Sequence, residues 1–130
     1  MRSDFSLGRL AEMQFCIDAA KRGLNVSIPQ HDHNGYDLIV EGKSKKLYKI
    51  QVKSTRQLER SGYKVMISRG SDNKKRYDKK EVDFFAVYIV QTANWFIIPF
   101  AMCSSVTLRI YPSKPDHKYT SYLEGFWQFK

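Results

Sequence analysis

The stretch GYDLIVEGKSKKLYKIQVKST, residues 35–55, indicates two short β-strands joined by a lysine-rich turn. Residues 36–41 (YDLIVE) and 46–54 (KLYKIQVKS) have the β-branched and aromatic content of strands. The segment between them, GKSKK, is too highly charged to lie in a core, and its composition is typical of a turn. This hairpin decides the fold, because it predicts an antiparallel pair around which a sheet can form.

Successive side chains of a strand point to opposite faces of the sheet. In the second strand, the residues expected on the apolar face are Tyr48, Ile50 and Val52. Gln51 and Lys53 share the other face with Lys49. Antiparallel pairing would bring Asp37, near the start of the first strand, opposite the end of the second strand. Asp37, Gln51 and Lys53 are therefore expected to converge at one rim of the sheet.

Carboxylate and amide oxygens are hard ligands that suit Mg²⁺, which keeps several waters and also binds phosphate oxygens. Bound Mg²⁺ can polarise a phosphodiester and help to generate hydroxide from water. A lysine beside the metal can orient or deprotonate the attacking water, or offset charge that develops on the phosphate. Glu12, a polar residue among apolar neighbours near the N-terminus, is the best candidate for a further acidic ligand.

A purely structural interpretation of the same residues is open. Asp37 can cap a turn, and Gln51 and Lys53 can form a solvated strand face. Glu12 can pair with Arg9 one helical turn earlier. Each residue alone favours this interpretation, whereas their combination, in this order and spacing, favours a site.

The rest of the chain predicts a single mixed α/β domain, residues 1–130, built on a central sheet. Residues 4–22 repeat apolar side chains at helical spacing, with Leu10 and Ile17 on the apolar face. Further strands are expected at 24–29, 63–68, 83–90 and 94–100. In the tail, 101–105 resembles the start of a short helix, 106–111 alternates like a strand, and 119–130 can pack as a helix or an extension.

The composition of the 130 residues is that of a globular protein with a marked basic excess, since 22 Lys and Arg against 13 Asp and Glu give a net charge of +9. Such an excess favours a polyanionic partner, most commonly nucleic acid. Cys16 and Cys103 lie far apart in apolar contexts and are expected as buried thiols. Because no signal-peptide core and no apolar run of membrane-spanning length occurs, an intracellular, cytoplasmic location is expected.

The segment RGSDNKKRYDKK, residues 69–80, fits contacts with phosphates, although a solvated loop would have the same composition. Arg56, which follows the hairpin, is a lesser candidate. The candidate DNA-binding residues are Arg69, Lys74, Lys75, Arg76, Lys79, Lys80 and Arg56. Zinc is not expected at the HDH of residues 31–33, because no further ligands accompany it. A core or subunit interface is expected for the prominent aromatic residues Tyr88, Trp95, Phe96, Phe100 and Trp127.

The helix-borne Glu12, the YD pair ending at Asp37 and the QVKS of residues 51–54 resemble the PD-(D/E)XK nuclease superfamily. Within it, the chain resembles the endonucleases encoded by group I introns and, more distantly, the archaeal-type Holliday junction resolvases, which have EVK where this chain has QVK. The likeness covers residues 8–100 well and the last 30 residues weakly.

The resemblance implies a restriction-endonuclease-like fold: a central mixed β-sheet flanked by helices. It also implies site roles. Asp37 would be the principal metal ligand, Gln51 would occupy the usual acidic position, Lys53 would be the motif lysine and Glu12 the acid on the helix. Gln51 departs from the pattern, since a neutral amide leaves less negative charge to hold the metal. Tyr36 also stands where the family has proline.

The function that follows from the resemblance is a Mg²⁺-dependent endodeoxyribonuclease, with Mn²⁺ as a possible substitute, acting on double-stranded DNA. A homing-type, site-specific enzyme that forms a homodimer or homotetramer is expected. A Holliday junction resolvase, a catalytically inactive DNA-binding module and an RNA-binding accessory protein are the alternatives.

Overall fold

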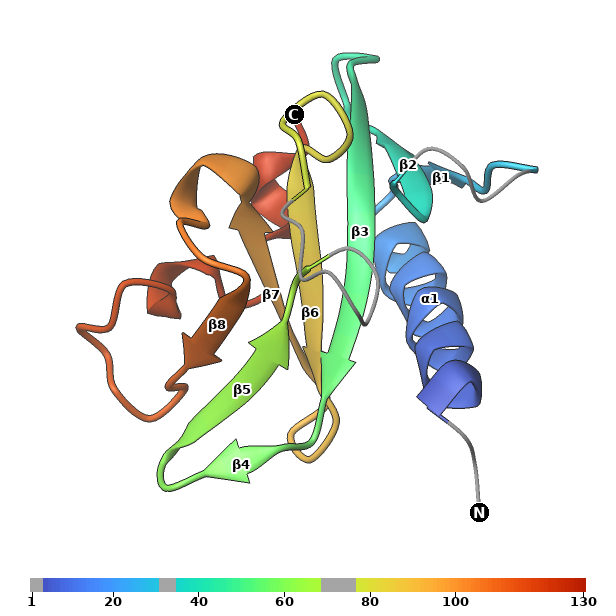
Figure 1. The fold of residues 1–130 in the computed structure, drawn as a ribbon. Coiled ribbons are helices and arrows are strands. Elements are labelled where there is room, and N and C mark those ends of the chain that lie inside the picture. The colour runs from blue at the N-terminus through green and yellow to red at the C-terminus, as the bar shows by residue number, and fades with distance from the viewer. Residues whose placement is uncertain (1–3, 31–34, 69–76) are drawn as a thin grey trace.

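The structure of the chain is a computed structural model that describes residues 4–30, 35–68 and 77–130 (Figure 1). It contains one α-helix, α1 (Asp4–Lys21), in this part of the chain. The strands are β1 (Asn25–Ser27), β2 (Leu38–Glu41), β3 (Leu47–Thr55), β4 (Leu58–Glu59), β5 (Gly62–Met66), β6 (Phe84–Ile89), β7 (Asn94–Pro99) and β8 (Thr107–Ile110). Three short 3₁₀ turns complete it: η1 (Phe100–Met102), η2 (Thr120–Tyr122) and η3 (Phe126–Gln128).

A five-stranded mixed sheet in the order β1-β2-β3-β6-β7 forms the centre of the fold. The β3 and β6 strands pair in parallel, and every other pair in this sheet is antiparallel. A second, antiparallel sheet has the order β4-β5-β8. The predicted hairpin and central mixed sheet are confirmed. As Figure 1 shows, the long β3 strand runs from the β2–β3 turn at one end to β4 at the other.

One face of the central sheet packs against α1. The apolar residues expected on β3, Tyr48, Ile50 and Val52, all lie in this core. Phe15 on α1 is fully buried, at 0% exposure, and its ring meets Trp95 edge-on with centroids 5.3 Å apart. Aromatic pairs of this geometry add about 0.5–1.5 kcal/mol to the area that they bury. The helix is therefore fixed on the sheet by aromatic packing.

The other face of the central sheet is covered by the second sheet. Phe85, Val87 and Ile89 of β6 form a core with the inward side chains of the smaller sheet. Those inward side chains alternate along their strands: Tyr63 and Val65 on β5, and Leu108 and Ile110 on β8. A hydrogen bond of 2.6 Å from Thr55 Oγ1 to the Lys64 carbonyl links the end of β3 to β5. The β6 strand is thus buried on both faces.

Several details differ from the sequence predictions. Leu10 and Ile17, expected on the apolar face of the helix, are 40% and 50% exposed, because α1 buries only a narrow stripe that includes Ala11, Phe15 and Ala19. The two-residue β4 strand was not predicted, since it is too short to carry a pattern. Residues 119–130, for which a last helix or an extension was predicted, contain the 3₁₀ turns η2 and η3.

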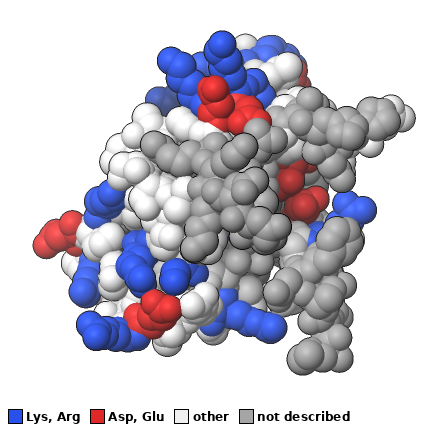
Figure 2. All heavy atoms as spheres, viewed as in Figure 1, with Lys and Arg blue, Asp and Glu red and all other residues white. Residues whose placement is uncertain are grey.

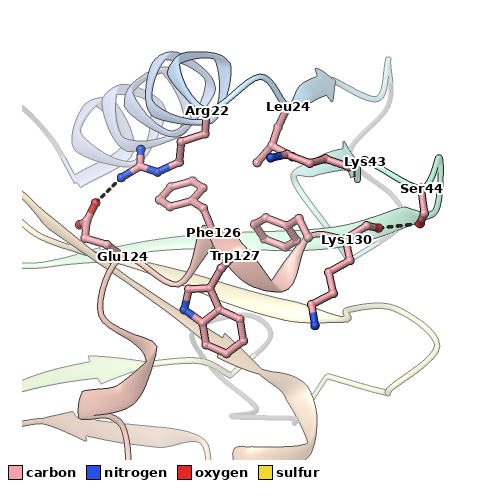
Figure 3. Close-up of a pocket in the computed structure, with 9 residues that line it drawn as sticks. Arg22, Leu24, Lys43, Ser44, Glu124, Phe126, Trp127 and Lys130 are labelled. Carbon is pink, nitrogen blue, oxygen red and sulfur yellow. Dashed lines mark hydrogen bonds and ion pairs between the residues drawn. The ribbon is translucent and has the colours of Figure 1, made fainter.

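The C-terminus packs against the β2–β3 turn (Figure 3). Ser44 Oγ donates a 2.7 Å hydrogen bond to the Lys130 carbonyl. A Cβ atom at Gly42 would lie 2.4 Å from the same oxygen, so only glycine permits this approach. Arg22 at the end of α1 lies over the Phe126 ring, 4.1 Å from its centroid. These contacts surround a pocket of about 740 Å³.

The two cysteines form no disulfide. Cys103 is buried, as expected, whereas Cys16 is half-buried on α1. In the described part of the chain, no helix has the length and apolar character needed to cross a membrane.

We predict that Phe15→Ala lowers the free energy of unfolding by about 3–5 kcal/mol, because it leaves a cavity beneath Trp95 and Phe126. Leu47→Ala removes an exposed apolar side chain and is the matched control, with an expected loss of about 0.5 kcal/mol or less. Urea unfolding followed by circular dichroism measures both. Equal losses in the two variants would contradict the assignment of the core.

Candidate active site

Asp37 lies directly before β2. At this end of the β2–β3 ladder, its side chain takes the place of the backbone group that a paired strand would offer to β3. Its backbone N–H donates to the Ile50 carbonyl at 2.8 Å. Its side chain accepts a 2.8 Å hydrogen bond at Oδ2 from the Val52 N–H. Asp37 is therefore bound to the residues on either side of Gln51, through its backbone N–H to Ile50 and through its carboxylate to Val52. Two backbone contacts of this kind fix the position of Asp37 tightly.

The turn that leads into Asp37 requires a glycine. Gly35 has a φ of +83°, a conformation that residues with a Cβ atom rarely adopt. A Cβ atom there would also lie 2.8 Å from Oε2 of Glu81. Sequence analysis did not single out Gly35, although a glycine placed directly before the YD pair was an available signal.

Gln51 is almost fully buried, at 9% exposure, although a solvated amide was one of the expectations for it. It lies beside Phe85 in the parallel β3–β6 pairing. Its side-chain amide makes no hydrogen bond to any other residue in the described part of the chain. Buried polar groups normally have such a partner. The amide oxygen is therefore available to a ligand at the level of the Asp37 carboxylate.

Glu12 on α1 and Asp37 line the same pocket, of about 590 Å³. Arg9 lines it too, and its Nη1 atom lies 3.9 Å from Glu12 Oε1. The Arg9–Glu12 pair belonged to the structural interpretation of these residues. Arg9 is exposed, and at this distance on a helix surface such a pair contributes little. The pairing with Arg9 leaves Glu12 within the pocket that it shares with Asp37.

Lys53 lies two residues beyond Gln51 on the same face of β3, where its side chain is half-buried. Its Nζ atom lies 5.7 Å from the centroid of the Tyr77 ring. Burial lowers the pKa of Lys53 below its ordinary value, and the negative charge of Asp37 partly opposes that shift. The Asp37 carboxylate and the Lys53 amine therefore interact electrostatically.

Lys53 and Arg56 line a second pocket, of about 370 Å³. Leu7 of α1 lines the Lys53 pocket, and Gly8, the next residue, lines the Asp37 pocket. Both pockets therefore border the N-terminal part of α1, and Lys53 lies on the same face of β3 as Gln51.

The candidate metal ligands carry oxygen donors, the ligand type that hard divalent ions prefer. In residues 4–30, 35–68 and 77–130, no group of three or more His, Cys, Asp or Glu residues lies close enough to hold a metal. Two carboxylates and one amide remain: Glu12, Asp37 and Gln51. This set suits a hard cation that completes its shell with water and substrate oxygens, whereas zinc needs a fuller protein cage.

Of the predicted DNA-binding residues, the structure describes three. Arg56, Lys79 and Lys80 are exposed. Arg69, Lys74, Lys75 and Arg76 lie outside the described residues, as do His31 and His33. The Lys80 carbonyl accepts a hydrogen bond from Lys49 Nζ, which places the end of this segment beside β3.

The aromatic residues fall into two groups. Trp95 and Phe96 are buried in the two cores, and Tyr88 packs on Trp95 with ring centroids 4.7 Å apart. Phe100 stacks on Phe85 at 6.2 Å. Trp127 is 61% exposed beside the C-terminal pocket, so it is not a core residue, and its place in a subunit interface stays a prediction.

We predict that burial of the Lys53 amine gives the free energy of unfolding a specific dependence on pH. Well below the lowered pKa, Lys53 is charged in both states, and the cost of burying that charge is fully present. As pH rises from the lowered pKa towards the ordinary value of 10.5, the unfolded state binds more protons, so the folded state becomes relatively more stable.

Lys53→Met removes this group and keeps most of the side-chain volume. Unfolding by urea at several alkaline pH values should show the wild type gaining stability relative to Lys53→Met as pH rises through that window. A difference between the two proteins that stays constant with pH would contradict a lowered pKa for Lys53.

Comparison with known proteins places this fold and site in a family. The PD-(D/E)XK endonuclease family matches residues 4–129, nearly the whole chain. No curated protein matches the sequence. Among solved structures, the bacterial homing endonuclease I-Ssp6803I is similar in fold, with a TM-score of 0.78 and 23% identity over 93% of this chain and 88% of that one. The architecture is therefore restriction-endonuclease-like, and the chain belongs to the PD-(D/E)XK endonuclease family.

Proposed function

We propose that this protein is a metal-dependent endonuclease that hydrolyses phosphodiester bonds in double-stranded DNA as a homing-type, site-specific enzyme. The observation that carries the proposal is the position of Asp37, whose carboxylate is held at β3 by the Val52 N–H and lines one pocket with Glu12. Lys53 lies on the same strand, and burial lowers its pKa while the charge of Asp37 partly opposes that shift. Membership of the family supports a nuclease with this arrangement.

Asp37, Gln51 and Glu12 would hold the divalent ion, Mg²⁺ or in its place Mn²⁺. When bound, such an ion polarises the phosphodiester and lowers the pKa of a water molecule. Asp37 is fixed for this role by the Val52 N–H, which donates to its Oδ2 atom. Gln51 contributes an uncharged amide oxygen. The protein therefore offers the ion two negative charges, from Asp37 and Glu12, where an acidic residue at position 51 would make three.

Lys53 contributes to the reaction in two ways, by transferring a proton and by stabilising negative charge. Because burial lowers its pKa, a larger fraction of the amine is neutral at a given pH than for an exposed lysine. The neutral amine can accept a proton from the attacking water, and the ammonium form can stabilise charge on the phosphate. The polar side of β3 thus supplies both functions close to Asp37.

Our first functional prediction concerns Lys53 and Asp37. Lys53→Ala should abolish cleavage of duplex DNA and leave DNA binding largely intact, because the amine acts on the reaction more than on affinity. Asp37→Asn should also lose cleavage, since it removes the negative charge and keeps the side-chain shape. Gel analysis of plasmid and linear duplex cleavage with Mg²⁺ measures both variants.

Lys49→Ala is the matched control, because Lys49 lies on the same face of β3 and carries the same charge. It should retain cleavage. Full cutting activity in Lys53→Ala would remove Lys53 from the mechanism.

The same assay separates this proposal from its alternatives. Wild-type protein should cut duplex DNA with Mg²⁺ or Mn²⁺ and stop when EDTA is added. No products at any metal concentration would favour a DNA-binding module without catalysis, with Gln51 as the reason. Preferential cutting of a four-way junction over a linear duplex would favour a junction resolvase. Competition between duplex DNA and RNA for binding addresses the RNA-binding alternative.

We also propose that the enzyme works as a homo-oligomer, since cutting two strands calls for two sites. The exposed apolar stripe of α1, formed by Leu10, Met13 and Ile17, is the surface that supports this proposal. These residues lie at helical spacings of three and four, so they occupy one face.

We predict that Ile17→Glu shifts the protein to a monomer in size-exclusion chromatography with light scattering, because it places a charge in an apolar interface. Leu47→Glu changes an exposed apolar residue on β3 and is the control, which should keep the wild-type mass. A monomeric wild type at micromolar concentration, or an unchanged mass for Ile17→Glu, would contradict the interface.

A further inference from the structure

The outer face of the second sheet carries positive charge from residues far apart in the sequence. Lys64 on β5 lies directly opposite Arg109 on β8. Both point away from the core, because their neighbours Val65, Leu108 and Ile110 are buried beneath the sheet. We call Lys64, Arg109 and the adjoining Lys118 the basic sheet face. Figure 2 shows Lys and Arg side chains gathered over the region where β4 and β5 lie in Figure 1, with acidic side chains among them.

The stability of the fold does not account for this pairing. Like charges placed directly opposite each other on neighbouring strands destabilise a sheet. Arg109 is partly compensated by Glu59 on β4, with Nη1 and Oε1 2.7 Å apart. Both members of that pair are substantially exposed, so it contributes little to stability. The positive charge of Lys64 and Arg109 is therefore suited to binding a negatively charged partner.

The basic sheet face is continuous with the candidate active site. Lys64 lines the pocket of about 370 Å³ that also contains Lys53. Lys64 lines as well the adjoining pocket of about 480 Å³, where Arg109 and Lys118 lie. Lys64 thus lines both pockets. The hydrogen bond from Thr55 to the Lys64 carbonyl fixes the backbone of Lys64 to β3. A strand of DNA that reaches Lys53 can continue over Lys64 to Arg109.

The pocket around Arg109 is lined by groups that bind phosphate. Besides the cations, it presents the hydroxyl-bearing side chains of Ser104, Ser105 and Thr107. His117 also lines it, and its buried Nδ1 atom has no hydrogen-bond partner among the described residues. Cations and hydroxyl groups are among the donors that usually contact the sugar–phosphate backbone of DNA.

From these observations we propose that the basic sheet face binds the sugar–phosphate backbone of duplex DNA beside the bond that is cut. This inference rests on the proposed endonuclease function and adds the surface that positions the substrate. Lys64 and Arg109 are positioning residues, since phosphate contacts fix the register of DNA without reading its sequence.

The test measures the affinity of the Lys53→Ala protein, which should not cut, for a short duplex at several salt concentrations. Adding Lys64→Gln or Arg109→Gln removes one phosphate contact. Each should reduce the salt slope of binding by about one and weaken affinity about eight-fold at 0.1 M salt. Lys64→Arg and Arg109→Lys keep the charge and should bind within about two-fold of the parent, because a phosphate contact needs only the positive charge.

Two further variants separate binding from structure. Glu59→Gln removes the acid beside Arg109 and should tighten DNA binding, whereas a merely structural Arg109–Glu59 pair would leave affinity unchanged or weaken it. Lys43→Gln removes a charge of the same sign from the β2–β3 turn, at the opposite end of β3 in Figure 1, and should have little effect. Thermal unfolding of each variant checks that it is folded.

Failure of this inference is distinguishable from failure of the proposed function. If the wild type binds and cuts DNA but the two glutamine variants keep its affinity and salt slope, the basic sheet face is not a DNA surface and the nuclease assignment stands. Absence of any DNA binding by the wild type would overturn both. Weakening that is equal for Lys43→Gln and Lys64→Gln would also overturn the inference, since it would reflect net charge alone.

Discussion

The hydrogen bond from the Val52 N–H to Asp37 Oδ2 is the interaction on which the arrangement of the site depends. The β2 strand begins at Leu38, so β3 continues past it without a backbone partner on that side. An unpaired buried N–H would cost about 1–3 kcal/mol. Asp37 satisfies this group at Oδ2, and it also lines a pocket with Glu12. One carboxylate thus ends the strand pairing and is the principal acid of the site that we propose.

The central sheet is buried on both faces. This explains why Lys53 lies in a different environment from Asp37 and Glu12. Residues of β3 that face α1 are apolar and enclosed by aromatic rings. On the other side, Gln51 is buried beside Phe85 of β6, and Lys53 is half-buried in a pocket that β5 also lines. This partial burial lowers the pKa of Lys53. The surroundings of this side of β3 therefore affect the protonation of Lys53.

The hairpin, the central sheet and α1 were predictable, because their patterns are local and their apolar periodicity is strong. The proximity of Asp37 to Gln51 also followed from antiparallel pairing. The sequence could not predict that Gln51 would be buried, since that depends on tertiary packing, including the pairing of β3 with the distant β6 strand. Nor could it predict that Leu10 and Ile17 would be exposed, because the narrow contact of α1 with the sheet is set by Phe15 and Trp95.

The basic sheet face was hidden in the sequence for a related reason. Lys64 and Arg109 are separated by 45 positions, and neither lies in a run of charge. Only the pairing of β5 with β8 brings them together. The basic segment at 69–80 was evident from composition alone, whereas a charged surface assembled by a sheet requires the register.

The most direct test of the account is the position of a metal ion. Crystals of the protein with duplex DNA and Mn²⁺, measured at a wavelength where manganese scatters anomalously, would reveal it in an anomalous difference map. We expect a peak within coordination distance of Asp37, with the Gln51 amide and Glu12 facing it directly or through water. A peak held by other residues, or an ordered DNA complex with no peak beside Asp37, would contradict it.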